Sequence, residues 1–210
     1  MTNTDRPAAV IFDLGGVIVM LGPLSDLLGS YAPPAEDFWP RWLHSEAVRA
    51  YEGGYCTTDE FADALTSEFS LPFGPEELLR RFAAWPKGLY PGATQLLEEL
   101  SEQNPALTVG ALSNSNPLHW SEQNDAEQIR ALFDTPFLSF EMKLLKPDPA
   151  IYRHVERALG LEPPEILYFD DNQINVDGAI NAGWRAHVAR HPDECRRYLA
   201  TYRLVATLKA

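Results

Sequence analysis

Asp13 is the residue whose type and setting most clearly point to chemistry. It follows the apolar run Ala-Val-Ile-Phe (residues 9–12) and precedes Leu-Gly-Gly, which contains Gly15 and Gly16. A short continuous run of this kind is typical of a buried parallel strand, and the chemistry of α/β proteins collects beyond the carboxyl ends of such strands. A carboxylate there can attack a phosphoryl group and form an aspartyl-phosphate that water then hydrolyses. We therefore expect Asp13 to be a nucleophile.

Three further segments place polar groups after predicted strands. They supply, in chain order, a hydroxyl with an amide, an ammonium and paired carboxylates: Ser113 and Asn114, Lys146, then Asp170 and Asp171 with Asn175 following. Each segment alone has an ordinary structural interpretation, since such residues also form turns, cap helices or lie in solvated loops. Their joint order with Asp13 indicates one shared site.

The elements that must position these groups are short strands alternating with helices. Apolar runs occur at residues 107–112, 136–140, 166–169 and 186–189, and helical patterns separate them. This alternation predicts a parallel, doubly wound sheet. The helix before the third run begins with Asp148 as N-cap and Pro149, and Gly160 ends it, so it is one crossover of a βαβ unit.

Residues 18–91 break this rhythm and contain no convincing strand. Helix starts are visible instead, with Thr57 and Glu60 as a capping box and Pro75 opening an amphipathic stretch. We therefore predict an all-helical cap, the helical insertion (residues 18–91), placed after the first strand of a catalytic core that comprises residues 1–17 and 92–210.

Composition limits the classes of partner and the cellular address. With 210 residues, 45% of them hydrophobic, the chain can bury one core and carry a small inserted subdomain. Thirty acidic against 17 basic residues give a net charge of −13, which disfavours nucleic acid and anionic membranes and favours a small-molecule partner. Two distant cysteines, no bilayer-spanning run and no signal-peptide pattern predict a cytoplasmic protein, expected as a monomer or homodimer.

In their order along the chain, these motifs resemble the haloacid dehalogenase-like superfamily. The segments Asp-Leu-Gly-Gly-Val-Ile-Val, Leu-Ser-Asn-Ser-Asn-Pro-Leu-His, Lys-Pro-Asp-Pro-Ala-Ile-Tyr-Arg-His-Val and Tyr-Phe-Asp-Asp-Asn are similar to bacterial α-D-glucose-1-phosphate phosphatases. The N-terminal phosphatase domain of soluble epoxide hydrolases is a more distant likeness. The resemblance implies a three-layer α/β/α flavodoxin-like (Rossmannoid) core with a parallel sheet, a helical cap that closes over the site, and hydrolysis of a small phosphorylated metabolite.

A hard divalent cation would hold both the nucleophile and a phosphate oxygen, and Mg²⁺ favours a few carboxylates together with water and substrate oxygens. The expected ligands are the side chains of Asp13 and Asp171 and, by resemblance, the backbone carbonyl of Gly15. Asp170 and Asn175 are expected to orient Asp171. Which of the two adjacent aspartates touches the metal directly stays open.

The phosphoryl oxygens also need hydrogen-bond donors and a fixed positive charge. Ser113, the neighbouring Asn114 and Lys146 are the expected binding groups. Lys143 is a weaker candidate, because it lacks the following proline and has the pattern of a solvated loop residue.

Gly15 raises a specific difficulty. In much of the superfamily an aspartate at this position protonates the leaving group and later activates water, and such acid–base help contributes about 10² to 10⁴-fold in rate. One solution is a substrate whose leaving group departs easily, such as an anomeric sugar phosphate. The other is a substitute acid at the substrate-binding site, for which His119, six residues after Ser113, is a candidate; a histidine at the start of a helix is more often a cap or loop contact.

Two other functions remain open. Dehalogenation on the same fold proceeds without metal and needs no acid at position 15, but Asp170 and Asp171 beside Asp13 would repel one another unless a cation lay among them. A catalytically weak phosphate-binding or interaction protein is the second alternative, because a fold alone does not decide function.

The helical insertion is expected to determine specificity. Trp39, Trp42 and Tyr51 have near-helical spacing, which predicts that they form its own core and not a substrate surface. Gly53 and Gly54 are interpreted as a bend that permits movement.

Overall fold

Five parallel strands form the central sheet in the computed structural model, which describes residues 6–121 and 125–206. The strands lie in the order β5-β4-β1-β6-β7. Their bounds are β1 Ala9–Phe12, β4 Thr108–Ser113, β5 Thr135–Leu138, β6 Ile166–Asp170 and β7 Arg185–Val188. The predicted run at 136–140 is two residues shorter at its end, because Ser139 and Phe140 begin the short helix α8 (Ser139–Met142).

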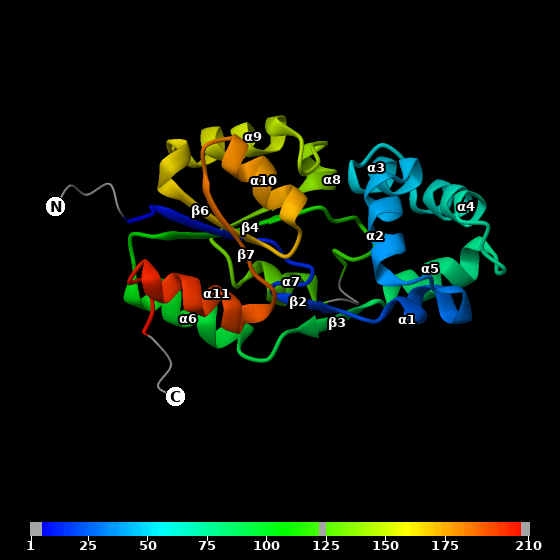
Figure 1. Cartoon of the computed structure of the whole chain (residues 1–210), viewed down its shortest axis with the longest axis horizontal. Helices are drawn as coiled ribbons and strands as arrows, with labels where there is room; N and C mark the ends of the chain where they lie inside the picture. Colours follow the sequence, from blue (N-terminus) through cyan, green and yellow to red (C-terminus); the bar gives the residue numbers. More distant parts are fainter. Residues whose placement is uncertain (1–5, 122–124, 207–210) are drawn as a thin grey trace.

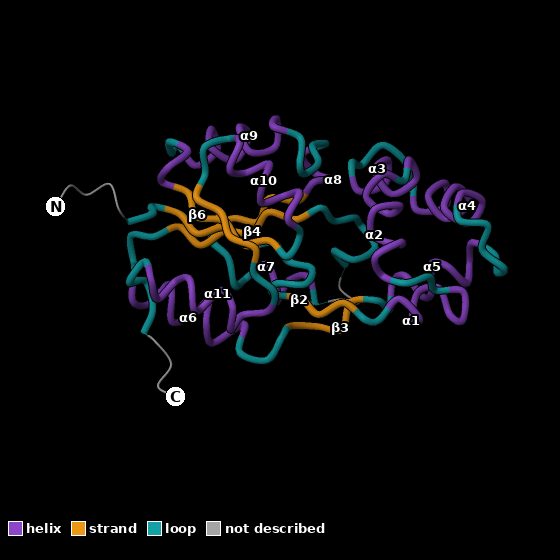
Figure 2. The backbone as a smooth tube through the Cα atoms, in the orientation of Figure 1, coloured by secondary structure: helices purple, strands orange, loops and turns teal. Residues whose placement is uncertain are grey.

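Helices cover both faces of this sheet, as Figures 1 and 2 show. One face carries α9 (Pro149–Leu159) and α10 (Gln173–Asn181), and the other carries α6 (Ala93–Gln103) and α11 (His191–Thr201), with the short α7 (Ala126–Arg130) nearby. Side chains of β1 point alternately to the two faces of the sheet. Val10 and Phe12 belong to the hydrophobic core on one face, and Ala9 and Ile11 belong to the core on the other. The predicted three-layer α/β/α fold is therefore confirmed.

The helical insertion lies at one end of the sheet and has a hydrophobic core of its own. Its helices are α1 Leu24–Leu28, α2 Ala35–His44, α3 Glu46–Glu52, α4 Thr58–Glu68 and α5 Pro75–Ala83, with a 3-10 turn at Gly29–Tyr31. Trp42 and Tyr51 lie buried in that core, as expected from their spacing, whereas Trp39 is 38% exposed and stacks on Trp85.

Two short strands, which the sequence did not predict, join the ends of the insertion to the rest of the chain. β2 (Val19–Leu21) and β3 (Pro86–Leu89) pair antiparallel in a separate two-stranded sheet. Their pairing joins residues 65 to 70 positions apart, and β3 contains Pro, Lys and Gly, so no local pattern marks it as a strand. The predicted boundaries between core and cap, after residue 17 and after residue 91, stay a prediction.

Local signals predicted several element ends correctly. α9 spans Pro149–Leu159 and ends at Gly160 with φ +66°, and Thr57 and Glu60 form both hydrogen bonds of a capping box at the start of α4. Within the described residues, no helix has the length and apolar character needed to span a membrane.

Candidate active site

The site forms where three adjacent strands end. β1 lies between β4 and β6 in the sheet, so Asp13, Ser113 and Asp170 follow or end neighbouring strands at the same edge. This edge faces the helical insertion. All three residues are buried, Asp170 completely. Parallel pairing thus converts positions far apart in the sequence into one cluster, as α/β sheets do at their carboxyl ends.

Lys146 is the positive centre of this cluster. Its ammonium nitrogen lies 2.9 Å from Asp13 Oδ1 and 2.7 Å from Asp170 Oδ2, and it donates to the carbonyl of Leu112 and the hydroxyl of Tyr168, each at 3.0 Å. The residue is only 2% exposed. Burial by itself lowers the pKa of Lys146, but the neighbouring carboxylates of Asp13 and Asp170 outweigh it and raise the pKa. The ammonium therefore stays charged.

Asn114 holds the loop that carries this lysine. Its amide oxygen accepts from the backbone N–H of Lys146 at 2.9 Å, and its amide nitrogen donates to the Lys146 carbonyl at 3.2 Å. Both ends of the Asn114 side chain are engaged in this way. The side chain therefore positions Lys146, and the expected contribution of Asn114 to phosphate binding is left to its backbone N–H.

The carboxylate of Asp170 is surrounded by donors. It accepts from Lys146, from the Tyr168 hydroxyl, from the backbone N–H of Asn172 at 2.9 Å and from the Asn175 amide at 3.1 Å. These contacts use both oxygens. Asp171, the next residue, is partly exposed, and its carboxylate lies with those of Asp13 and Asp170 in a group whose ligand oxygens are all within 4.8 Å of one another.

Negative charge exceeds positive charge in this group. Burial, together with Asp170 and Asp171, raises the pKa of Asp13 from 3.8 to about 7, although Lys146 opposes the shift. Burial and Asp170 likewise raise the pKa of Asp171 to about 6, while Lys146 and Arg190 lower it. Three carboxylates facing one ammonium are the setting in which a divalent cation relieves repulsion. The donor set is oxygen only, which fits Mg²⁺.

The two glycines after Leu14 have different structural roles. Gly16 has φ +77°, and a Cβ there would lie 2.6 Å from Asp171 Oδ2, so this position needs glycine to let the backbone approach the carboxylate. A Cβ at Gly15 would meet only the Leu21 side chain, at an ordinary 3.4 Å. A side chain is therefore sterically possible at position 15, and its absence is a chemical feature of this chain.

The surroundings of His119 do not favour the role of a substitute acid. Its Nε2 lies 2.8 Å from the Phe82 carbonyl, and its Nδ1 lies 3.3 Å from the Asn116 amide nitrogen, so both ring nitrogens have partners. Burial lowers the pKa of His119 to about 4. A neutral imidazole fixed in this way joins the β4 loop to the end of α5. These contacts favour the interpretation as a loop contact.

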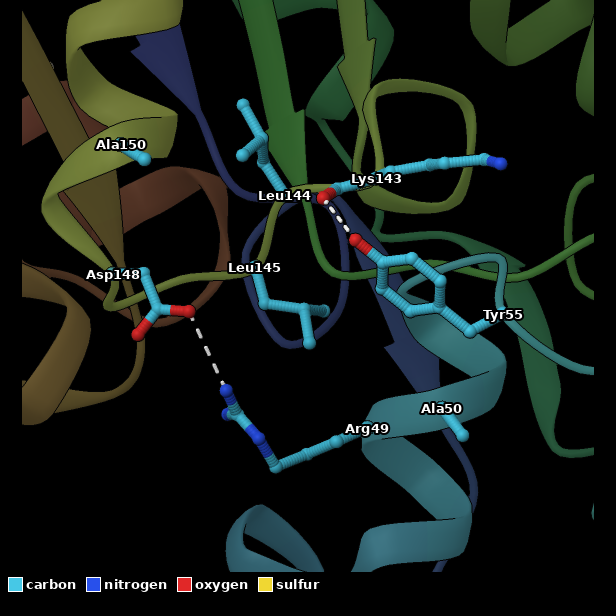
Figure 3. A pocket seen from close by; sticks show the side chains of 8 residues that line it. All are labelled: Arg49, Ala50, Tyr55, Lys143, Leu144, Leu145, Asp148 and Ala150. Atoms are coloured by element: carbon cyan, nitrogen blue, oxygen red, sulfur yellow. Dashed lines mark hydrogen bonds and ion pairs between the residues drawn. The ribbon is translucent and has the colours of Figure 1, made fainter.

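Lys143 also lies outside the charged cluster, as its sequence context predicted. It is exposed and left-handed at φ +56°, and its carbonyl accepts from the Tyr55 hydroxyl at 2.9 Å. Figure 3 shows this contact beside a surface pocket of about 450 Å³ between α3 and the segment 143–150, where Arg49 reaches Asp148 at 3.4 Å.

Two groups near the site have no counterpart among the sequence predictions. Tyr168 lies two residues before Asp170 on β6, hence on the same face of the strand, and this period of two is the signal that could have identified it. Glu52, in α3, is influenced by the charges of Lys146 and Asp13. The sequence drew attention to Tyr51 before it and to the two glycines after it, but not to Glu52 itself.

Comparison with known proteins decides the family. The chain matches the haloacid dehalogenase-like hydrolases over residues 7–183. It belongs to this family. The hydrolase is 29% identical over 203 residues to Phosphatase MT3486 of Mycobacterium tuberculosis, with 90% of each chain covered. It is 26% identical to the Phosphorylated carbohydrates phosphatase of Thermotoga maritima, covering 83% of this chain and 81% of that one.

A solved relative has the same fold as this hydrolase. It is the HAD family enzyme bt-2542 of Bacteroides thetaiotaomicron, with a TM-score of 0.72 at 22% identity, covering 92% of this chain and 98% of that one. A second structure of that enzyme, in complex with magnesium and inorganic phosphate, has a TM-score of 0.67 at 22% identity, covering 88% and 94%.

Proposed function

We propose that this hydrolase is a Mg²⁺-dependent phosphatase that cleaves phosphate monoesters of a small metabolite through an aspartyl-phosphate on Asp13. The buried cluster of Asp13, Lys146, Asp170 and Asp171 is the observation that supports this most strongly. The names of two relatives, one a phosphatase and one a phosphatase of phosphorylated carbohydrates, support it too.

The metal ligands proposed are the side chains of Asp13 and Asp171 and the backbone carbonyl of Gly15. Asp171 is preferred to Asp170 because the oxygens of Asp170 already accept from Lys146, Tyr168 and its neighbours, whereas Asp171 lies toward the partly exposed side. Bound Mg²⁺ would neutralise charge on the phosphoryl group and on Asp13. The complex of bt-2542 with magnesium and inorganic phosphate supports this assignment.

The chain's own residues account for the remaining steps. Lys146 holds Asp13 Oδ1 at 2.9 Å, and the backbone N–H of Leu14 donates to the same oxygen at 2.7 Å, so one carboxylate oxygen is fixed and the other can attack phosphorus. The Ser113 hydroxyl and the backbone N–H groups that follow it are proposed to bind the phosphoryl oxygens. Lys146 offsets the charge that gathers on them.

Metal-free dehalogenation is the second candidate function. The paired aspartates count against it, because Asp170 and Asp171 raise the pKa of Asp13 and so weaken it as a nucleophile when no cation is bound. We propose sugar phosphates as the first substrates to examine, on the basis of the carbohydrate-phosphatase relative.

The test is a panel of phosphate esters, including sugar phosphates, and 2-haloacids, each assayed with Mg²⁺ and with chelator. We expect phosphate release that requires Mg²⁺ and falls at least about 10³-fold in Asp13→Asn, since the nucleophile is removed. Asp59→Asn, the same change at an exposed position of α4, should retain full activity. Halide release in chelator would establish dehalogenation instead, and phosphate binding without turnover would establish a binding protein.

A further inference from the structure

The open question at this site is which group protonates the leaving oxygen. Position 15 is glycine, and the space beside it contains the Leu21 side chain. His119 is neutral and has partners on both ring nitrogens. For a substrate whose leaving oxygen needs a proton, the donor would therefore come from another element that faces the carboxyl ends of β1 and β4, and the helical insertion faces them.

The end of α3 is held directly against the loops of the site. Glu52 is the last residue of this helix, and its carbonyl accepts from the Ser139 hydroxyl at 2.6 Å. The same hydroxyl accepts from the backbone N–H of Ser115 at 2.9 Å, only two residues beyond Ser113. Ser139 is fully buried. One hydroxyl thus fixes the backbone of Glu52 relative to the loop after β4.

Two contacts on either side of Glu52 reinforce this placement, as Figure 3 shows. Arg49, three residues earlier, reaches Asp148, and Tyr55, three residues later, donates to the Lys143 carbonyl. Together with the Ser139 contact, they attach α3 and the turn after it to the segment 139–148, which carries Lys146.

The carboxyl group of Glu52 is near enough to the site to be influenced by its charges. The charged groups that influence it are Lys146 and Asp13 from the site and Arg49 from its own helix. The pKa of Glu52 is raised from 4.5 to about 8; burial is the main cause and Asp13 adds to the shift, while Lys146 and Arg49 oppose it. A carboxyl group of this kind carries its proton at neutral pH, as general acids of this type must.

We propose that Glu52 is the general acid–base of the phosphatase reaction and takes the place of the side chain that Gly15 lacks. This proposal rests on the proposed function. As Asp13 forms its bond to phosphorus and the bond from phosphorus to the leaving oxygen breaks, the Glu52 proton passes to that oxygen. Glu52 then accepts a proton from water as the water oxygen bonds to phosphorus and the bond to Asp13 breaks, which regenerates the starting state.

Two leaving groups separate this role from a structural one. In Glu52→Gln, hydrolysis of an alkyl phosphate should fall at least about 100-fold in kcat, because its alkoxide needs a proton, whereas an aryl phosphate with an acidic phenol should fall less than about 5-fold. In the wild type, kcat/KM for the alkyl phosphate should decline at alkaline pH as Glu52 loses its proton. This decline should disappear in Glu52→Gln. Glu46→Gln, the same change at the exposed start of α3, should leave both rates unchanged.

Two further measurements control for folding and for alternatives. Glu52→Gln should unfold at a higher urea concentration than the wild type at pH 7, because the native state no longer holds in protonated form a carboxyl group that ionises in the unfolded chain. Since a Cβ fits at position 15, Gly15→Asp combined with Glu52→Gln should restore at least 10% of alkyl phosphate activity, on the order of a tenfold recovery.

The outcomes separate the two proposals. Equal losses on alkyl and aryl phosphates, or none on either, would overturn the role of Glu52 while leaving the phosphatase proposal intact. If the wild-type enzyme with Mg²⁺ hydrolyses neither ester, the proposed function itself fails.

Discussion

His119 is neutral in the native protein because its buried surroundings do not solvate the charged imidazolium form. Its ring packs on Phe82 with centroids 4.1 Å apart, and Nε2 contacts the Phe82 carbonyl. The pKa near 4 lies below the ordinary value of 6.5. Between these values the unfolded chain binds a proton that the native state does not, so this residue lowers stability as the pH falls.

We expect the His119→Gln variant to show a weaker pH dependence of unfolding than the wild type. From pH 7 to pH 5 the wild type should lose about 2 kcal/mol more of its free energy of unfolding than the variant, which has no titrating ring. Urea denaturation at both pH values measures this difference, and changes from all other groups cancel in the comparison. Parallel pH profiles would show that His119 accepts its proton in the folded state.

The residues of the charged cluster differ in how visible they are in the sequence. Asp13, Ser113 and Asp170 stand at the ends of apolar runs, and parallel pairing brings such ends together, so local pattern was enough to place them near one another. Glu52 has no such marker. Its approach to Asp13 depends on how α3 docks, which no local pattern in the chain specifies.

At the scale of elements, the docking of α3 depends on a close backbone approach. Gly54 has φ +68°, and a Cβ at this position would lie 2.3 Å from the Phe140 carbonyl oxygen of α8. From the sequence alone, Gly53 and Gly54 are interpreted as a bend for movement. The structure gives Gly54 a more specific role, because only glycine lets the turn after α3 contact α8 at this distance.

We therefore expect Gly54→Ala to weaken the attachment of the insertion. A left-handed alanine costs about 1–2 kcal/mol, and the clash with a backbone oxygen adds to it, so the free energy of unfolding should fall by at least about 2 kcal/mol. Urea denaturation measures the loss. Gly74→Ala is the matched control, since a Cβ at Gly74 meets nothing within 4 Å, and equal stability of the two variants would contradict the inferred contact.

Elements with local signals were predicted well and those without were not. α9 has a proline at its start and a left-handed glycine at its end, and its predicted limits are confirmed. β2 and β3 are short, and each becomes a strand only because the other lies beside it. Cooperative pairing over a long sequence separation leaves no periodicity to recognise.

At the scale of the whole molecule, the formal net charge of −13 and the acidic cluster are separate electrostatic properties. Any salt screens the surface charge, because exposed charges interact weakly beyond a Debye length of about 10 Å at 0.1 M. Salt screens the charges of the buried cluster much less. A cation that binds this cluster specifically would therefore stabilise the protein even when the ionic strength, and with it the screening of surface charge, is held constant. This difference allows the proposed metal site to be tested without an activity assay.

Mg²⁺ should stabilise the folded protein by binding it in preference to the unfolded chain. At free Mg²⁺ about 100-fold above its dissociation constant, the free energy of unfolding should rise by about 2.7 kcal/mol relative to chelator with NaCl at equal ionic strength. Thermal and urea unfolding measure this rise. Asp171→Asn should remove most of it, because the variant loses a proposed ligand, while Asp59→Asn on exposed α4 should keep it. If NaCl alone produced the same rise, or if Asp171→Asn retained it, the stabilisation would come from screening of surface charge and not from a site at Asp13 and Asp171.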